Sequence, residues 1–269
     1  MAGIVSASMP VVVVKNETFG NVAFNTLNEG IGKVLRMGAY SPDVIERLKW
    51  MENVMLPVLS KAIKKAEKME LKPIIAEALT MGDELHNRSR AASYLLFAKI
   101  TPYLLETMED TKNTNDVINF MQANIHTFLP FIMASCKASL DPARNIEGST
   151  MVTAMSRNGT DWGIQVSGLG DEWFVTEAPV PDVLLFPGFK KEDVGRDIGD
   201  SSIMETAGLG GFAIAAAPAI IQFVGGNVAL GTSKNLSMYE ITIGENNIYK
   251  IPNFDGRGTP TAVSYTHLT

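Results

Sequence analysis

The residues best suited to chemistry are gathered in two short stretches, of which the first is residues 82–88, GDELHNR. It lies between two apolar segments of helical periodicity. Asp83 and His86 are three positions apart, so on a helical turn they would share a face, and the carboxylate would orient the imidazole and raise its basicity. His86 is then a candidate proton carrier, and the Arg88 guanidinium suits a carboxylate or phosphate. A local cap with a salt bridge is the alternative.

The second stretch is a predicted β-hairpin over residues 150–174. Apolar and polar residues alternate on both sides of Asn158-Gly159, a pair that favours the positive φ angles of a type I′ turn. The polar residues around this turn are Ser156, Arg157, Asn158, Thr160 and Asp161. Polar groups on a rigid hairpin suit a small polar ligand, and an ordinary exposed hairpin is the alternative.

Together the two stretches predict a site for a small substrate that carries a carboxylate or a phosphate. It needs cations for the anionic groups, carboxamides for an amide or carbonyl, and a histidine with a carboxylate for proton transfer. The residues in these roles are, in that order, Arg88 and Arg157, Asn87 and Asn158, and His86 with Asp83 or Asp161. Thr160 and Ser202 complete the expected substrate-binding set. We recognise no Ser-His-Asp signature, metal motif or cofactor fingerprint, so we expect neither a metal nor a cofactor.

The surrounding pattern predicts an α+β fold, with a mixed α/β body and a helical subdomain. Residues 1–40 and 141–263 would form the body, and residues 41–140 the helical subdomain, which begins at the cap Ser41-Pro42-Asp43 and is kinked or divided at Pro57. Residues 11–14 read as a strand buried on both faces. Asn25, Asn28 and Glu29 are assigned to turns, with a polar pocket as the alternative.

The segments after the hairpin are expected to be short. Residues 183–186 read as a strand or extended segment, Ser202 and Glu205 as a capping box, residues 212–223 as an apolar helix, and residues 236–244 as a further helix. The glycines before residue 212 have two interpretations: their backbone N–H groups bind an anion, or they allow close packing of helices.

Composition excludes several classes of protein. With 46% hydrophobic and 19% charged residues, the 269-residue chain can bury a substantial core, and its net charge of −6 leaves no basic footprint for nucleic acid. No signal peptide or membrane span is evident, since the most lipid-like stretch, residues 208–224, is interrupted by glycine, proline and glutamine. The single cysteine, Cys136, indicates a reducing compartment, the cytoplasm, and reads as a packing residue.

Several longer motifs occur in an order that resembles the AllG-like (YlbE-like) proteins. They are residues 1–10 (beginning MAGIVS), 16–21 (NETFGN), 26–33 (TLNEGIGK), 81–88 (MGDELHNR), 155–161 (MSRNGTD), 163–168 (GIQVSG) and 199–211 (beginning GDS). The resemblance covers about residues 1–262. One departure is Leu85, where we expect cysteine in many relatives; a role for that thiol could not operate here.

The resemblance implies a subunit of oxamate carbamoyltransferase, which converts oxalurate and phosphate to oxamate and carbamoyl phosphate in anaerobic allantoin breakdown. It further implies a complex with other subunits, including an FdrA-like protein. It assigns no residue roles, so those given above come from the residues alone. Two alternatives stay open: a non-catalytic assembly or regulatory subunit, and an enzyme for another ureido or acyl-CoA substrate.

The two ends of the sequence do not follow the internal pattern. Residues 264–269, SYTHLT, resemble a translated sequencing adapter, so we expect an artefactual tail. Family members are expected to be longer at both ends, which favours the interpretation that the sequence is a fragment.

Overall fold

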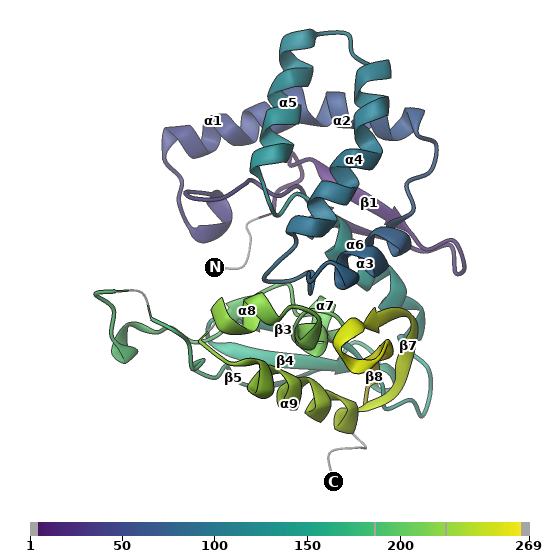
Figure 1. Ribbon diagram of the computed structural model, residues 1–269, viewed down its shortest axis with the longest axis vertical. Coiled ribbons are helices and arrows are strands. Elements are labelled where there is room, and N and C mark those ends of the chain that lie inside the picture. The colour runs from purple at the N-terminus through teal and green to yellow at the C-terminus, as the bar shows by residue number, and fades with distance from the viewer. Residues whose placement is uncertain (1–4, 186, 224, 265–269) are drawn as a thin grey trace.

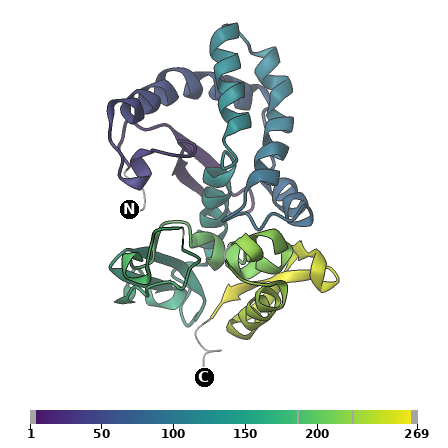
Figure 2. The same cartoon turned by 60° about the vertical axis from the view of Figure 1, so that its left-hand side comes forward.

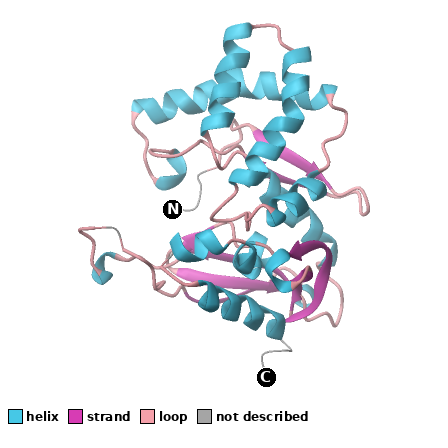
Figure 3. Ribbon diagram, viewed as in Figure 1, coloured by secondary structure: helices cyan, strands magenta, loops and turns pink. Residues whose placement is uncertain are grey.

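The computed structural model describes residues 5–185, 187–223 and 225–264. They form two stacked halves, of which the upper in Figure 1 is mainly helical and the lower carries a four-stranded sheet, a second hairpin and short helices. Figure 3 shows the same division by secondary structure. The expected α+β class is confirmed.

The helical half follows the periodicity of the sequence closely. Its helices are α1 Pro42–Trp50, α2 Leu56–Lys65, α3 Leu71–Thr80, α4 Arg90–Glu106, α5 Thr111–Ala123 and α6 Leu129–Leu140. The predicted start at Pro42 is confirmed, with Asp43 in the first turn. A π-helix, Met51–Met55, joins α1 to α2, so the long helix is divided just before Pro57, which has no N–H to donate.

One hydrophobic core joins the two halves. Ile75 and Leu79 of α3 and Ile132 of α6 are fully buried in a cluster that also contains Met204 and Ile251 from the lower half. A second cluster lies inside the helical half, between α1–α2, α4 and α5. Because α3 and α6 contribute to the shared core, residues far apart in the sequence are held firmly at the junction of the halves.

The first hairpin corrects one prediction. Strands β1 Val11–Lys15 and β2 Val22–Thr26 pair only with each other in the described chain, and both pack on α6. Val12 is buried while Val11 and Val13 are exposed, so β1 is buried on one face and not on both. Its apolar run therefore overstated the burial of the strand. Figure 2 shows this hairpin beside the helices of the upper half.

The lower half is built on an antiparallel sheet of order β5-β4-β3-β6. Its strands are β3 Val152–Asn158, β4 Asp161–Val166, β5 Trp173–Glu177 and β6 Ile198–Gly199. The predicted hairpin is present, but its turn is not type I′, because Gly159 has a positive φ and Asn158 does not. The Arg157–Trp162 register leaves a four-residue connection in which the Asn158 carboxamide accepts hydrogen bonds.

The last third of the chain departs most from expectation. It contains α7 Ile203–Thr206, 3₁₀ turns over Gly210–Ala216, α8 Pro218–Phe223, α9 Val228–Met238, and the hairpin of β7 Thr242–Ile251 with β8 Arg257–Val263. The expected helix over residues 212–223 is thus broken by a 3₁₀ segment that kinks at Ala213. Residues 242–244 belong to β7 and not to a helix, and residues 183–185 form no strand.

Three expectations fall on positions outside the described residues: Phe186 of the predicted extended segment, Val224 of the lipid-like stretch, and residues 265–269 of the tail. Within the described part of the chain, no helix has both the length and the apolar character that crossing a bilayer requires. The division into body and subdomain stays a prediction, with the β1–β2 hairpin packed on the helical half.

Candidate functional site

A loop between α3 and α4 carries the first predicted stretch, and two buried acids hold it in shape. The Asp83 carboxylate accepts hydrogen bonds from the backbone N–H groups of Leu85, Ala91 and Ala92, and so caps α4. The Glu84 carboxylate accepts from the N–H groups of His86 and Arg88 at 3.0 and 2.7 Å. The segment is therefore a tight loop and not a helical turn.

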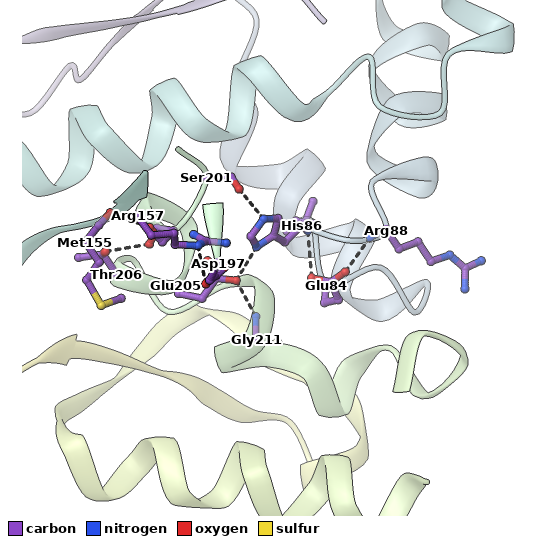
Figure 4. A network of polar contacts seen from close by, with 12 residues as sticks. Glu84, His86, Arg88, Met155, Arg157, Asp197, Ser201, Glu205, Thr206 and Gly211 are labelled. Carbon is purple, nitrogen blue, oxygen red and sulfur yellow. Dashed lines mark hydrogen bonds and ion pairs between the residues drawn. The ribbon is translucent and has the colours of Figure 1, made fainter. Parts of the chain in front are cut away.

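The fixed loop presents His86 to the lower half of the molecule (Figure 4). Nδ1 of His86 donates to Glu205 Oε1 at 2.5 Å, and Nε2 lies 2.6 Å from the Ser201 hydroxyl oxygen. Asp83 was predicted to orient His86, but its carboxylate is engaged by backbone groups and Glu205 takes that role. The reason is the loop conformation, in which residues three apart do not share a face.

Glu205 is itself held from several sides. Its Oε1 also accepts the N–H of Gly211 at 2.9 Å. Gly210, with φ +59°, donates its N–H to the Glu84 carbonyl, and a Cβ on it would lie 2.0 Å from Glu205 Oε1. Glycine is thus required at 210 by both the backbone angle and the close approach of the carboxylate.

The electrostatics favour an ion pair between His86 and Glu205. Burial alone lowers the pKa of His86, but the Glu205 charge and hydrogen bond outweigh it, and the pKa is raised above its usual 6.5. Burial likewise tends to raise the pKa of Glu205, yet the charge and hydrogen bond of His86 and the Gly211 N–H hold it below its usual value. Nδ1–H is thereby fixed toward the carboxylate, and in the neutral imidazole Nε2 accepts the Ser201 proton.

The supporting acids behave differently from Glu205. Burial raises the pKa of Glu84 to about 7 and that of Asp83 to about 6, although the backbone N–H groups oppose the shift in both. Both are fully buried. They shape the loop and do not line the cleft, and the charge of Glu84 also helps to raise the pKa of His86.

A cleft of about 840 Å³ opens beside this constellation. Its lining from the lower half and the α3–α4 loop includes His86, Asn87, Gly199, Asp200 and Ser201. The opposite wall comes from the helical half and the first hairpin and includes Asn25, Asn28, Glu29, Arg36, Lys49 and His126. Asn25, Asn28 and Glu29, which the sequence assigned to turns, therefore line this cleft, together with many apolar residues.

One part of the cleft wall contains Arg36, His126 and the buried side chain of Asn28. Burial lowers the pKa of His126, and the nearby charges of Arg36, His86 and Arg90 lower it further. Asn28 is 4% exposed, and its Nδ2 has no hydrogen-bond partner among the described residues, while its Oδ1 accepts from Asn124 and Gly30. A buried donor with no partner is uncommon, and an oxygen of a ligand would satisfy it.

The hairpin residues lie apart from this cleft. Asn158, Thr160 and Asp161 are exposed, and none of them lines it. The carboxamide oxygen of Asn158 accepts from the N–H groups of Thr160 and Asp161 and from the Thr160 hydroxyl. These side chains are consumed in shaping their own turn, which is the alternative the sequence left open.

The other predicted residues divide between contact and support. Asn87 is exposed and lines the cleft, whereas the Arg88 side chain points away from His86 in Figure 4. Arg157 pairs with Asp197 at 2.9 Å and does not line the cleft, and its charge tends to lower the pKa of His86. Ser202 is buried and donates to the Met155 carbonyl, so it neither caps α7 nor reaches the cleft.

Ser201 and Glu205 are candidate site residues that the sequence did not predict. They are separated from His86 by 115 and 119 positions, and no spacing rule connects them. The one local signal was the SSIME segment, which was assigned to a capping box. In the structure Glu205 turns to His86, and the acid–histidine–serine order of a catalytic triad results, although no such signature was recognised in the sequence.

Cys136 and Leu85 are structural. Both lie in the shared core, and burial raises the pKa of the Cys136 thiol, which keeps it protonated. Leu85 is fully buried with φ +74°. The packing interpretation of Cys136 is confirmed.

Comparison with known proteins shows which proteins this chain resembles. The sequence model of the family described as oxamate carbamoyltransferase subunit AllG matches residues 1–201. The chain is 44% identical to the uncharacterized protein YahG of Escherichia coli K12, over all of this chain and 57% of YahG. It is also 44% identical to the oxamate carbamoyltransferase subunit AllG of the same organism, over 96% of this chain and 62% of that subunit.

A solved structure has the same fold. It is the crystal structure of a conserved protein of unknown function from Enterococcus faecalis V583, with a TM-score of 0.95 and 43% identity over 98% of this chain and 63% of that one. The chain thus spans about three fifths of the length of the relatives it matches.

Proposed function

The chain belongs to the AllG family, and on that premise we propose that it is part of an oxamate carbamoyltransferase subunit that contributes catalytic groups to the active site. The reaction would be the conversion of oxalurate and phosphate to oxamate and carbamoyl phosphate. Partner subunits, an FdrA-like protein among them, and a cytoplasmic setting belong to the same proposal.

The observation that carries the proposal is the place of His86. It lines the cleft and is hydrogen-bonded on one side to the half-buried Glu205 and on the other to Ser201. Cleavage of oxalurate leaves charge on the nitrogen that departs with oxamate, and a histidine that exchanges a proton near neutral pH can neutralise it. An imidazole set in one tautomer by a carboxylate is prepared for this transfer.

The opposite wall of the cleft supplies groups that could bind two anionic substrates, oxalurate and phosphate. Arg36 lines the cleft close enough to His126 to lower its pKa, and it replaces Arg88 and Arg157 as the proposed ligand for phosphate or the oxalurate carboxylate. The unpaired Asn28 Nδ2 suits a carbonyl or carboxylate oxygen. Asn87 keeps its proposed role toward the ureido group, because it lies in the cleft beside His86.

The test is a reconstituted complex with oxalurate and phosphate, assayed for carbamoyl phosphate with and without this chain. We expect product only when the chain is present, and a roughly 10²-fold or larger loss of kcat in His86→Asn. Arg36→Gln should mainly raise the KM for phosphate or oxalurate. His86→Asn keeps a polar side chain of similar width, which limits its effect on folding.

An assembly role is the rival outcome of the same experiment. If product requires the chain but is indifferent to both His86→Asn and Arg36→Gln, the chain acts as a scaffold. If the partner subunits alone turn over oxalurate at the full rate, the catalytic proposal is wrong. A panel of other ureido acids and of acyl-CoA substrates would then identify the activity.

A further inference from the structure

The hydroxyl of Ser201 has a placement that proton transfer by His86 alone does not require. It lies 2.6 Å from Nε2, the imidazole nitrogen opposite the one that meets Glu205. This nitrogen is the one that accepts a hydroxyl proton when Nδ1–H is held by a carboxylate. Glu205, His86 and Ser201 therefore form a hydrogen-bonded series that ends at a serine hydroxyl oxygen, the arrangement of a catalytic triad.

The backbone around Ser201 fixes that oxygen. The preceding Ile198–Gly199 strand pairs with β3, and the Ser201 carbonyl accepts the N–H of Met204. The next residue, Ser202, is tied by its hydroxyl to the Met155 carbonyl. Ser201 thus lies between the edge strand β6 and α7. Of the two serines, Ser202 uses its hydroxyl to hold the backbone, whereas the Ser201 hydroxyl contacts His86.

Accessibility separates the two serines in the same way. Ser201 is half-buried and lines the cleft together with His86 and Asn87. Ser202 is buried and does not line it. A serine placed for packing would not need a histidine–carboxylate pair behind its hydroxyl and an open cleft before it.

We propose that Ser201 is a nucleophile that accepts the carbamoyl group in a covalent step, activated by His86 and Glu205. The proposal rests on the function above for the identity of the acyl group. Ser201 Oγ attacks the ureido carbonyl carbon of oxalurate, and the bond from that carbon to the oxamate nitrogen breaks. The Oγ proton passes to His86 Nε2 and then to the departing nitrogen, leaving a serine carbamate and free oxamate.

The second half restores the enzyme. An oxygen of hydrogen phosphate attacks the carbamate carbon, its proton passes to His86 Nε2, the bond from that carbon to Ser201 Oγ breaks, and His86 gives the proton to Oγ. Carbamoyl phosphate leaves, and no oxidant, reductant or further reactant is consumed. Splitting one transfer into two steps on an activated serine is the usual gain of nucleophilic catalysis.

Isotope exchange tests the covalent step directly in the assembled complex. Labelled oxamate is incubated with oxalurate without phosphate, and label in oxalurate is measured. A carbamoyl-serine predicts exchange that is lost roughly 10³-fold in Ser201→Ala and persists in the matched control Ser202→Ala. If the complex shows no exchange, and its phosphate-dependent turnover is unchanged in Ser201→Ala, the covalent proposal is wrong while the proposed carbamoyltransferase function stands.

A second measurement uses the chain without the natural substrate. A fluorophosphonate probe is incubated with the folded chain and the modified residue is identified by peptide mass spectrometry. We expect modification at Ser201, loss of labelling in Ser201→Ala and His86→Asn, and normal labelling in Ser202→Ala, with thermal unfolding as the check on folding. If Ser201 is labelled but the complex does not react with oxalurate, Ser201 is a nucleophile and its assignment to carbamoyl transfer is wrong. Wild-type chain that is folded and unlabelled, with no isotope exchange, would overturn both parts.

Discussion

The α3–α4 loop and the tip of the β3–β4 hairpin carry the same kinds of residue, and the structure uses them in opposite ways. At the hairpin tip, Asn158, Thr160 and Asp161 bond to one another within three positions of sequence and stay exposed. In the loop, His86 reaches Ser201 and Glu205 more than a hundred positions away and lines a cleft. A polar cluster that satisfies itself locally shapes a turn, whereas one whose partners are distant and whose support is buried can be set for chemistry.

The support beneath the two clusters differs as well. The loop is held from within by Asp83 and Glu84, both fully buried and both bonded to backbone N–H groups. The hairpin tip has no buried acid among the described residues around it. Of these two regions, the loop that carries His86 is thus the one in which two carboxyl groups are desolvated. Their burial costs free energy, and their hydrogen bonds fix the position of the loop.

The largest expected effect separates the two regions by catalysis. His86→Asn should lower kcat by roughly 10³–10⁴-fold, because both the proton relay and its hydroxyl partner lose their base. Asp161→Asn should leave kcat within about twofold, since the Asp161 side chain is exposed and bonds to Asn158 and Thr160 of its own turn. Steady-state kinetics of the two variants in the same complex check this, and a large loss in Asp161→Asn would break the comparison.

Glu205→Gln should lower kcat by roughly 10²–10³-fold and change its pH dependence. The neutral imidazole is the active base, so kcat/KM should rise with pH as free His86 loses its proton. The Glu205 charge raises the His86 pKa, so without it the midpoint of this rise should move to lower pH. A profile measured from about pH 5 to about pH 9 tests the sign. A midpoint that stays in place would show that His86 is not the titrating group.

The buried acids should leave a signature in stability. Burial raises the Glu84 pKa from 4.5 to about 7, so the folded state holds this proton more tightly than the unfolded chain. This contribution to the free energy of unfolding is fully present below the pKa of Glu84 in the unfolded chain. It is lost as the pH rises through the pKa of Glu84 in the folded state, and it amounts to about 3 kcal/mol. Denaturant unfolding between about pH 4 and pH 8 should show this fall. Glu84→Gln should flatten it, and an equal slope in that variant would refute the assignment.

Two glycine substitutions provide a smaller, paired test. Gly210→Ala places a Cβ 2.0 Å from Glu205 Oε1 at a positive φ, so we expect about 1–3 kcal/mol of destabilisation and roughly tenfold lower kcat. Gly159→Ala, also at positive φ, meets Ile198 at 3.3 Å and should cost about 1 kcal/mol with kcat unchanged. Thermal unfolding and kinetics of both variants are compared. Equal losses of kcat would mean that strain alone lowers activity.

Local chemistry explains which features could be predicted. The Ser41-Pro42-Asp43 start, the division before Pro57 and the packing of Cys136 depend on neighbours in sequence or on one apolar face, and all three are found. The α+β class follows from the same periodicities. Residue type and neighbouring polar residues were enough to select His86 as a candidate, although they did not identify its hydrogen-bond partners.

The failures share a physical cause, which is that tertiary contacts redirect side chains. Ser202 and Glu205 match a capping box, but their side chains bond to Met155 and His86 instead. The Asp83 carboxylate does not contact His86, because it accepts from two backbone N–H groups where α4 begins and from that of Leu85 in the loop. Ser201 gives no local signal, since its hydrogen bond with His86 exists only once the segment before α7 and the α3–α4 loop meet.

The oxamate–oxalurate exchange rate without phosphate, measured in His86→Asn, Ser201→Ala and Asp161→Asn complexes, tests the role of the His86–Ser201 pair most directly. We predict exchange in the wild type, near-wild-type exchange in Asp161→Asn, and losses of roughly 10³-fold in the other two. Equal exchange in all four complexes would contradict it, because the loop, the cleft and the relay would then have no part in the chemistry.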